Sequence, residues 1–278
     1  MKLLRYGPVG EEKPALLDAQ GNIRDLTGVI GDLGGEMLEL DQLERLKALD
    51  PASLPLVTGR PRIGACVSHV ETFYGIGLNY AQHAREAGMD APKEPIIFNK
   101  SASCLAGPND ALTLPVGSEK SDWEVELGVV IGRRAQNVSV EDALGYVAGY
   151  CVINDLSERA FQTERGGQWT KGKSAPGFGP CGPYIVTADQ VPDPQSLRLK
   201  LSLNGAVMQD NMTKDMIFSV AEIIAHMSEF MALVPGDVIA TGTPEGVGMG
   251  LKPQRFLRSG DVMELEIEGL GAQRTEVL

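Results

Sequence analysis

Short apolar segments separated by glycine and proline dominate the sequence after residue 70, and they constrain the fold more than any other feature. Their β-branched and other apolar residues are typical of strands. They lie at 95–100, 122–132, 147–155, 182–187, 198–205 and 261–269. One long helix is predicted over 216–231, where apolar residues recur at helical spacing before Pro235-Gly236. Because strands outnumber helices, we expect an α+β or mixed-β fold rather than a doubly wound sheet.

Residues 1–69 are expected to form a small N-terminal α+β module followed by a linker. The helix of this module is predicted over 40–49, where four leucines recur at helical spacing. Its strands are expected at 2–6, 14–18 and 22–26. Three prolines in the segment 50–64 then indicate a linker, which places the second and larger domain at 70–278.

Charge and cysteine content exclude several classes of protein. The net charge of −12 disfavours nucleic acid and anionic membrane surfaces as partners. No signal peptide and no apolar run of about 18 residues is found, so no membrane span is expected. The four cysteines have no zinc-site spacing and are expected to be buried free thiols in a reducing cytoplasm. They are Cys66, Cys104, Cys151 and Cys181.

Three acidic residues give the strongest chemical signal. Glu124 and Glu126 are two apart in a predicted strand, so their side chains point to the same face. Asp155 ends the apolar run 147–154 and could be a third carboxylate at the same place. Such oxygen ligands suit hard ions such as Mg²⁺, Mn²⁺ or Ca²⁺. The pair could equally be the solvated face of an edge strand, so the spacing alone leaves both interpretations open.

A short helix is predicted at 79–87, with Asn79 as its N-cap, and it carries a second candidate pair. His83 and Glu86 are three apart and share a helix face, where a carboxylate would orient the imidazole and raise its basicity. A histidine held in this way can activate water. A solvent-exposed His–Glu pair is the alternative interpretation.

Two glycine-rich segments follow. Residues 167–174 match the phosphate-loop string G-x-x-x-x-G-K-[ST], but three prolines and three glycines come next, so no helix can follow and we reject a nucleotide site. Lys173 within it could stabilise an oxyanion or be an ordinary loop lysine. The segment 241–248, after a predicted strand, could present hydroxyl and N–H groups to an anion or be a plain turn.

In this order, these segments resemble the fumarylacetoacetate hydrolase superfamily. The resemblance covers residues 70–278 and is carried by GLNYAQHARE, DWEVELGVVIG, YCVINDLSERAFQ, GGQWTKGKS, LNGAVMQD and VIATGTPEGVG. It implies a mixed β-sandwich or β-roll catalytic domain, a divalent metal, usually Mg²⁺, and a homodimer. It makes Glu124, Glu126 and Asp155 the metal ligands, and His83 with Glu86 the water-activating pair. It also places Lys173 and Gln162 near the reacting oxygens, Thr243 at the substrate carboxylate and Lys100 in the pocket lining.

The resemblance implies an enzyme that cleaves a C–C bond of a 2,4-dioxo acid, releasing pyruvate and a carboxylic acid. The opening segment 5–18 is similar to members that act on 2,4-diketo-3-deoxy sugar acids. Residues 173–178 depart from the K-S-x-D-T-F pattern of many members. Alternatives are an oxaloacetate decarboxylase or other acylpyruvase, a ureidoglycolate lyase, and a non-catalytic metabolite binder.

Overall fold

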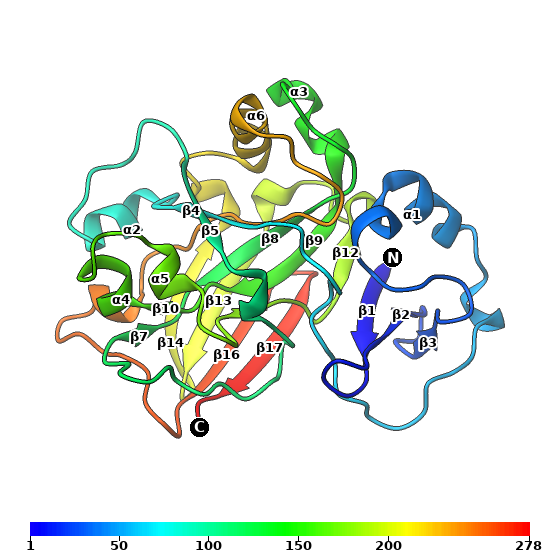
Figure 1. Ribbon diagram of the computed structural model, residues 1–278, viewed down its shortest axis with the longest axis horizontal. Helices are drawn as coiled ribbons and strands as arrows, with labels where there is room; N and C mark the ends of the chain where they lie inside the picture. Colours follow the sequence, from blue (N-terminus) through cyan, green and yellow to red (C-terminus); the bar gives the residue numbers. More distant parts are fainter.

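A nine-stranded mixed sheet runs through the centre of the molecule in the computed structural model, which describes all 278 residues (Figure 1). Neighbouring strands are antiparallel except for one parallel pair, β15 with β4. In spatial order the strands are β3 (Ile23–Asp25), β2 (Lys13–Leu17), β1 (Lys2–Tyr6), β12 (Ile185–Thr187), β9 (Val147–Asn154), β8 (Val125–Ile131), β15 (Val238–Ala240), β4 (Phe73–Gly77) and β5 (Ile96–Lys100).

A second, four-stranded antiparallel sheet packs against β8 and β9. Its strands are β14 (Ala206–Met212), β13 (Arg198–Leu203), β16 (Val262–Ile267) and β17 (Gly271–Glu276). Side chains alternate along it, so that Leu199 and Leu201 of β13 and Met263 and Leu265 of β16 are buried between the sheets. Two small sheets complete the strands, β7 (Ser121–Asp122) with β10 (Ser157–Glu158) and β6 (Leu105–Ala106) with β11 (Gly179–Pro180).

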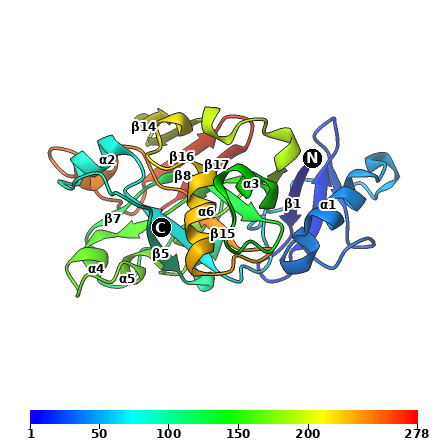
Figure 2. The ribbon, with the colours of Figure 1, turned by 90° about the horizontal axis from the view of Figure 1, so that it is seen from above.

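Six short α-helices surround the sheets. They are α1 (Leu40–Lys47), α2 (Ala81–Glu86), α3 (Val140–Ala143), α4 (Arg159–Thr163), α5 (Thr170–Lys173) and α6 (Val220–Phe230). Helix α6 begins with a capping box between Ser219 and Glu222 and packs against α3. Helices α2, α4 and α5 gather at the end of the molecule opposite the N-terminal strands (Figures 1 and 2). None of the helices has the length and apolar character needed to span a membrane.

The predicted α+β class with a strand-dominated core is confirmed. The N-terminal residues do form three strands and a helix, but the strands are not a separate sheet. Strand β1 pairs with β12, so β1–β3 extend the central sheet at one edge (Figure 1). A main-chain ladder therefore joins the N-terminal module to the rest of the molecule.

One local prediction was wrong. The sequence suggested that Asn79 caps helix α2, but the N-cap is Tyr80, and it makes no side-chain cap. The Asn79 amide instead donates to the carbonyls of Phe218 and Thr241, and it accepts from the Phe218 N–H. Its buried side chain therefore links the end of β4 to two distant loops rather than starting the helix.

Candidate active site

The three predicted carboxylates meet at one end of the β8–β9 pair. Glu126 lies in β8, Glu124 lies just before it, and Asp155 directly follows β9. The register brings Asp155 to Glu124, whose carbonyl accepts from the Asp155 N–H at 2.9 Å. Carboxylate oxygens of all three lie within 4.8 Å of one another, and each residue is at most 3% exposed. The solvated-edge interpretation is therefore wrong, because β8 lies inside the sheet with both faces covered.

Two buried cations compensate part of this negative charge. Lys173 Nζ lies 2.6 Å from both Glu124 Oε2 and Asp155 Oδ2, and Arg159 Nη2 donates to Glu124 Oε1 at 2.7 Å. Burial opposes the charge of Glu124, but Lys173 and Arg159 outweigh it and hold the pKa of Glu124 well below its ordinary value. Burial likewise opposes the charge of Lys173, and Asp155 and Glu124 overcome it to raise the pKa of Lys173.

Glu126 has no such partner. Its Oε2 accepts from the main-chain N–H of Gly242 at 2.8 Å, and no lysine or arginine pairs with it. Burial, followed by repulsion from Asp155 and Glu124, raises the pKa of Glu126 well above its ordinary value. The cluster thus holds one carboxylate whose charge is not balanced by a side chain.

This donor set fits a hard divalent cation. Three carboxylates can supply one oxygen each, and Mg²⁺ and Mn²⁺ favour oxygen ligands of this kind. A cation would also balance the charge of Glu126. The ammonium group of Lys173 lies between two of the three carboxylates, so it competes with a metal for the same oxygens.

A pocket opens directly over the carboxylates, and two aromatic rings line one side of it. Glu124, Glu126 and Asp155 line this pocket together with Phe98 and Trp169. The rings pack where β4 has no side chains. A Cβ at Gly75 would lie 2.2 Å from the Phe98 ring, and one at Gly77 would lie 2.3 Å from the Trp169 ring. The two glycines of the β4 segment therefore make room for the apolar wall of the pocket.

The predicted His83–Glu86 pair lies at the same pocket. His83 is 5% exposed and lines the cavity, and its Nδ1 lies 3.5 Å from Glu86 Oε2, longer than a good hydrogen bond. Glu86 accepts from the main-chain N–H of Gly246 at 3.1 and 3.2 Å. The loop at 242–249 thus fixes the carboxylate that faces the histidine.

The same loop also fixes a carboxylate that the sequence prediction missed. The N–H groups of Gly248 and Met249 donate to Asp122 at 2.6 and 3.0 Å, and Arg159 Nε donates to the same carboxylate at 2.9 Å. The anion predicted for this loop therefore corresponds to the protein's own acids: Glu86, Asp122 and Glu126.

Asp122 could have been found by extending the period-two pattern of Glu124 and Glu126 back by one step. Nothing in the sequence pattern pointed to Arg159, whose role arises from tertiary contacts.

Of the remaining predicted residues, Gln162 and Thr243 line the pocket and Lys100 does not. Gln162 Oε1 accepts from Arg159, which leaves the amide N–H groups of Gln162 available. Thr243 also lines the pocket, but its hydroxyl already donates to the Val125 carbonyl and accepts from Gln209.

Lys100, in contrast, is not among the pocket-lining residues. It lies behind Asp155, and its ammonium donates to Asp155 Oδ1 at 2.5 Å and to the Lys173 carbonyl at 2.6 Å. Lys100 therefore contacts Asp155 from outside the pocket rather than lining it.

The chain matches one known protein family and a relative of similar length. The model of the fumarylacetoacetate (FAA) hydrolase C-terminal family matches residues 72–278. A protein of Burkholderia cenocepacia, named only "Putative hydrolase", is 60% identical over 274 residues, which cover 98% of this chain and 97% of that protein.

Several solved structures are similar over the whole chain, among them a hydrolase and an isomerase. The fumarylacetoacetate hydrolase of Exiguobacterium antarcticum has 34% identity and a TM-score of 0.87, covering 100% of this chain and 99% of that one. The 5-carboxymethyl-2-hydroxymuconate delta-isomerase of Mycobacterium smegmatis has 30% identity and a TM-score of 0.77, with the same coverage. Hydrolases and isomerases thus share this fold.

Proposed function

Because the chain belongs to the fumarylacetoacetate hydrolase family, we propose that it is a metal-dependent hydrolase that cleaves a C–C bond of a 2,4-dioxo acid. The products would be pyruvate and a carboxylic acid. One observation carries this proposal: the buried carboxylates Glu124, Glu126 and Asp155, the Lys173 ammonium, and His83 with Glu86 behind it all meet at one pocket, which every one of them except Glu86 lines.

Glu124, Glu126 and Asp155 would hold the cation, which we propose to be Mg²⁺, with Mn²⁺ and Ca²⁺ as further candidates. When bound, the cation would polarise the carboxylate and 2-oxo oxygens of the substrate and stabilise negative charge that develops there. A homodimer and a cytoplasmic location belong to the same proposal. They rest on the resemblance to the family and on the free cysteines.

His83 would act on water. Its Nδ1 faces Glu86, which leaves Nε2 to accept a proton from a water molecule that attacks the C4 carbonyl. Negative charge then develops on the C4 oxygen. The Lys173 ammonium and the free amide N–H groups of Gln162 are the donors that could stabilise it. The C3–C4 bond would break when the negative C4 oxygen re-forms the C4 carbonyl. A proton delivered to C3 would complete the release of pyruvate.

The residues that line the pocket indicate which kind of acyl arm the substrate would carry. The resemblance implies a 2,4-diketo-3-deoxy sugar acid, whose hydroxyl groups need polar partners such as Gln162 and Thr163. The rings of Phe98 and Trp169, with Met249, form an apolar wall instead, and this observation favours an apolar acyl arm. Both substrate types therefore belong in a direct comparison.

Oxaloacetate decarboxylation is a second candidate, since it also generates an enolate of pyruvate but requires no attacking water. The histidine pair favours hydrolysis. Isomerisation is the activity named for one of the similar structures. The three reactions differ in product, because only hydrolysis gives pyruvate together with a second carboxylic acid.

The test is a pyruvate-release assay after exhaustive chelation, with and without added Mg²⁺, on a panel of 2,4-dioxo acids with sugar-derived and alkyl arms, and on oxaloacetate. We expect Mg²⁺ to restore hydrolysis. His83→Ala should then lower it by about 10²- to 10⁴-fold while changing oxaloacetate decarboxylation little. His226→Ala, on α6, is the matched control. Equal losses in both reactions would remove His83 as the water activator, and full activity after chelation would refute the metal assignment.

A further inference from the structure

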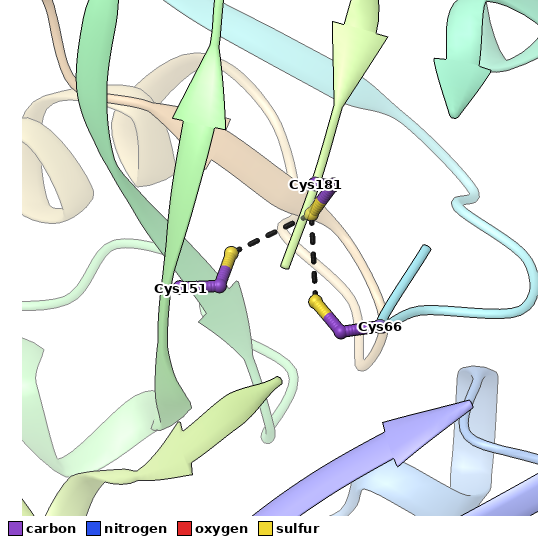
Figure 3. Close-up of side chains that lie close together, drawn as sticks. All are labelled: Cys66, Cys151 and Cys181. Carbon is purple, nitrogen blue, oxygen red and sulfur yellow. Dashed lines mark hydrogen bonds between the residues drawn. The ribbon is translucent and has the colours of Figure 1, made fainter. Parts of the chain in front are cut away.

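Three of the four cysteines form a compact cluster away from the pocket. Cys181 Sγ lies 3.6 Å from Cys66 Sγ and 3.5 Å from Cys151 Sγ (Figure 3). All three side chains are fully buried, and none of them lines the pocket described above. In Figure 3 the dashed lines join the Cys181 sulfur to each of the other two, so Cys181 is the member shared by both hydrogen-bond contacts, and all three sulfur atoms lie within 4.8 Å of one another.

The three sulfur atoms come from three different parts of the chain. Cys66 lies in the segment that leads from the N-terminal module to β4, Cys151 lies in β9, and Cys181 follows β11. Main-chain hydrogen bonds hold these segments together, because the Cys66 N–H donates to the Cys181 carbonyl at 3.1 Å and Cys181 pairs with Ile153 of β9. The Gln273 amide also donates to carbonyls beside the cluster, at Val152 and Gly182.

The surroundings disfavour a metal ion at this cluster. Thiols must lose their protons to bind a metal, and three thiolates around a divalent ion, or two around a monovalent ion, would leave a net negative charge in the core. No lysine, arginine or histidine is paired with these sulfur atoms, whose recorded partners are each other. A disulfide is neutral, so it carries no such cost in an apolar interior.

Proton sharing within the cluster favours one thiol as the first to react. The S–H groups of Cys151 and Cys66 can both donate to Cys181, and these bonds hold the pKa of Cys181 below its ordinary value. Burial raises the pKa of Cys66 in the same cluster. A thiolate is the reactive form of cysteine towards peroxides.

We propose that these residues form a buried oxidation site, in which Cys181 makes a disulfide with either Cys66 or Cys151 when the protein meets a peroxide. The Cys181 thiolate attacks one peroxide oxygen, so that a sulfenic acid forms and hydroxide leaves. The neighbouring thiol then attacks the sulfenic sulfur, the S–S bond forms, and water leaves with the thiol proton. Overall, two thiols lose two electrons and two protons, and hydrogen peroxide is reduced to two waters.

The two disulfides would differ in their effect on stability. A Cys66–Cys181 bond spans 115 positions and a Cys151–Cys181 bond spans 30. The longer loop restricts the unfolded chain more, so the first bond should raise the melting temperature more than the second. It would also link the segment around Cys66 covalently to the segment that connects β11 and β12.

The experiment uses the reduced full chain, treated with hydrogen peroxide and then unfolded for thiol titration and intact-mass measurement. The reduced chain should yield four thiols and the treated chain two, with a mass loss of about two daltons that a dithiol reductant reverses. Before unfolding, a bulky aromatic disulfide reagent should detect none, since all four cysteines are buried.

Single substitutions identify the shared partner. Cys66→Ala, Cys151→Ala and the matched control Cys104→Ala, a buried cysteine outside the cluster, should each begin with three thiols and keep one after peroxide. Cys181→Ala should keep all three. Circular dichroism checks that each variant folds, and peptide mapping of the oxidised wild type identifies the bond without any variant.

Three results would overturn the proposal. The wild type could keep four thiols after peroxide, or Cys181→Ala could lose two like the other variants. Thiols that return after a copper(I) chelator, without a reductant, would show a metal site instead of a disulfide.

Discussion

Glu126 differs from the other two carboxylates of the cluster in its surroundings. Glu124 and Asp155 each touch the Lys173 ammonium, whereas Glu126 has only a main-chain N–H. Removing one member of a buried ion pair leaves the other charge uncompensated, but removing a carboxyl group without a charged partner does not. Substitution of the two glutamates should therefore affect stability in different ways, even though both are assigned to the metal.

We expect Glu126→Gln to leave the metal-free protein at least as stable as the wild type, and Glu124→Gln to destabilise it by about 3 kcal/mol. Urea unfolding measures both free energies. Both variants should weaken Mg²⁺ binding in calorimetry by more than about 100-fold, since a ligand should matter at least as much as the groups that orient it. Equal destabilisation by the two substitutions would contradict the different charge environments.

The advantage of Glu126→Gln should depend on pH. Below pH 4.5, the ordinary pKa of a glutamate, folded and unfolded chains both hold the Glu126 proton, so the substitution gains nothing. At higher pH the unfolded chain ionises freely, while the folded chain keeps its proton because the pKa of Glu126 is raised. Wild-type stability should therefore fall relative to the variant as the pH rises towards neutrality. A difference that stays constant over this range would count against the raised pKa.

At this scale the sequence predicted part of the candidate site. The period-two spacing of Glu124 and Glu126, and the place of Asp155 after an apolar run, indicated a cluster but left a solvated edge strand open as the alternative, which only the structure excludes. Arg159 was missed because its three partners are separated from it along the chain or lie on its own helix, and no periodicity marks them. Lys100 was predicted in the pocket lining, but the sequence does not show on which side of Asp155 its ammonium group lies.

Among the elements, helix α2 and the loop at 242–249 act together. The loop holds Glu86, and Glu86 faces His83. Gly250, just after the loop, lies close to the same side chain, because a Cβ built there would be 1.9 Å from Glu86 Oε1. The contact is with a flexible side chain rather than with the backbone, so a methyl group here should displace Glu86 without disturbing the loop.

Gly250→Ala should lower hydrolysis by about 10²-fold, because His83 would lose the carboxylate that orients it. Mg²⁺ affinity should not change, since none of the three proposed ligands is touched. Gly145→Ala is the matched control, because nothing lies within 4 Å of a Cβ at that position. Full activity of Gly250→Ala would show that Glu86 has no part in the reaction.

The strands were easier to predict from the sequence than their partners. Alternation and glycine-rich turns located β8, β9, β13 and β16, and the Asn204-Gly205 turn between β13 and β14 has the positive φ angles that a tight hairpin requires. The insertion of β15 between β8 and β4 could not be predicted, because it joins segments about 110 and 165 positions apart. The error at Asn79 has the same origin, since tertiary contacts outweighed a local capping preference.

On the scale of the whole molecule, the shared sheet makes the N-terminal module part of the structural core. Strand β1 covers the edge of β12, and Leu3 and Leu16 of the module belong to the same buried cluster as β8 and β9. Without residues 1–69, the β12 edge and this apolar surface would be open to solvent.

A chain that begins at residue 70 should therefore aggregate, whereas the full chain stays in solution under the same conditions. Refolding yield and size-exclusion chromatography measure this difference. Adding residues 1–69 as a separate peptide during refolding should recover part of the soluble protein. A monomeric, cooperatively folded 70–278 fragment would contradict the role of the shared sheet.

The loop at 242–249 binds three acidic side chains through main-chain N–H groups, those of Glu86, Asp122 and Glu126. Many of its side chains therefore take no part in these hydrogen bonds, so their identity does not affect them. Gly246 and Gly248 are exceptions, because a Cβ there would lie 1.9 and 1.8 Å from neighbouring carbonyl oxygens. Met249 combines both properties, since its N–H holds Asp122 while its side chain lines the pocket. A library of substitutions at Met249 should therefore alter substrate preference while the hydrogen bond from its main-chain N–H to Asp122 is kept.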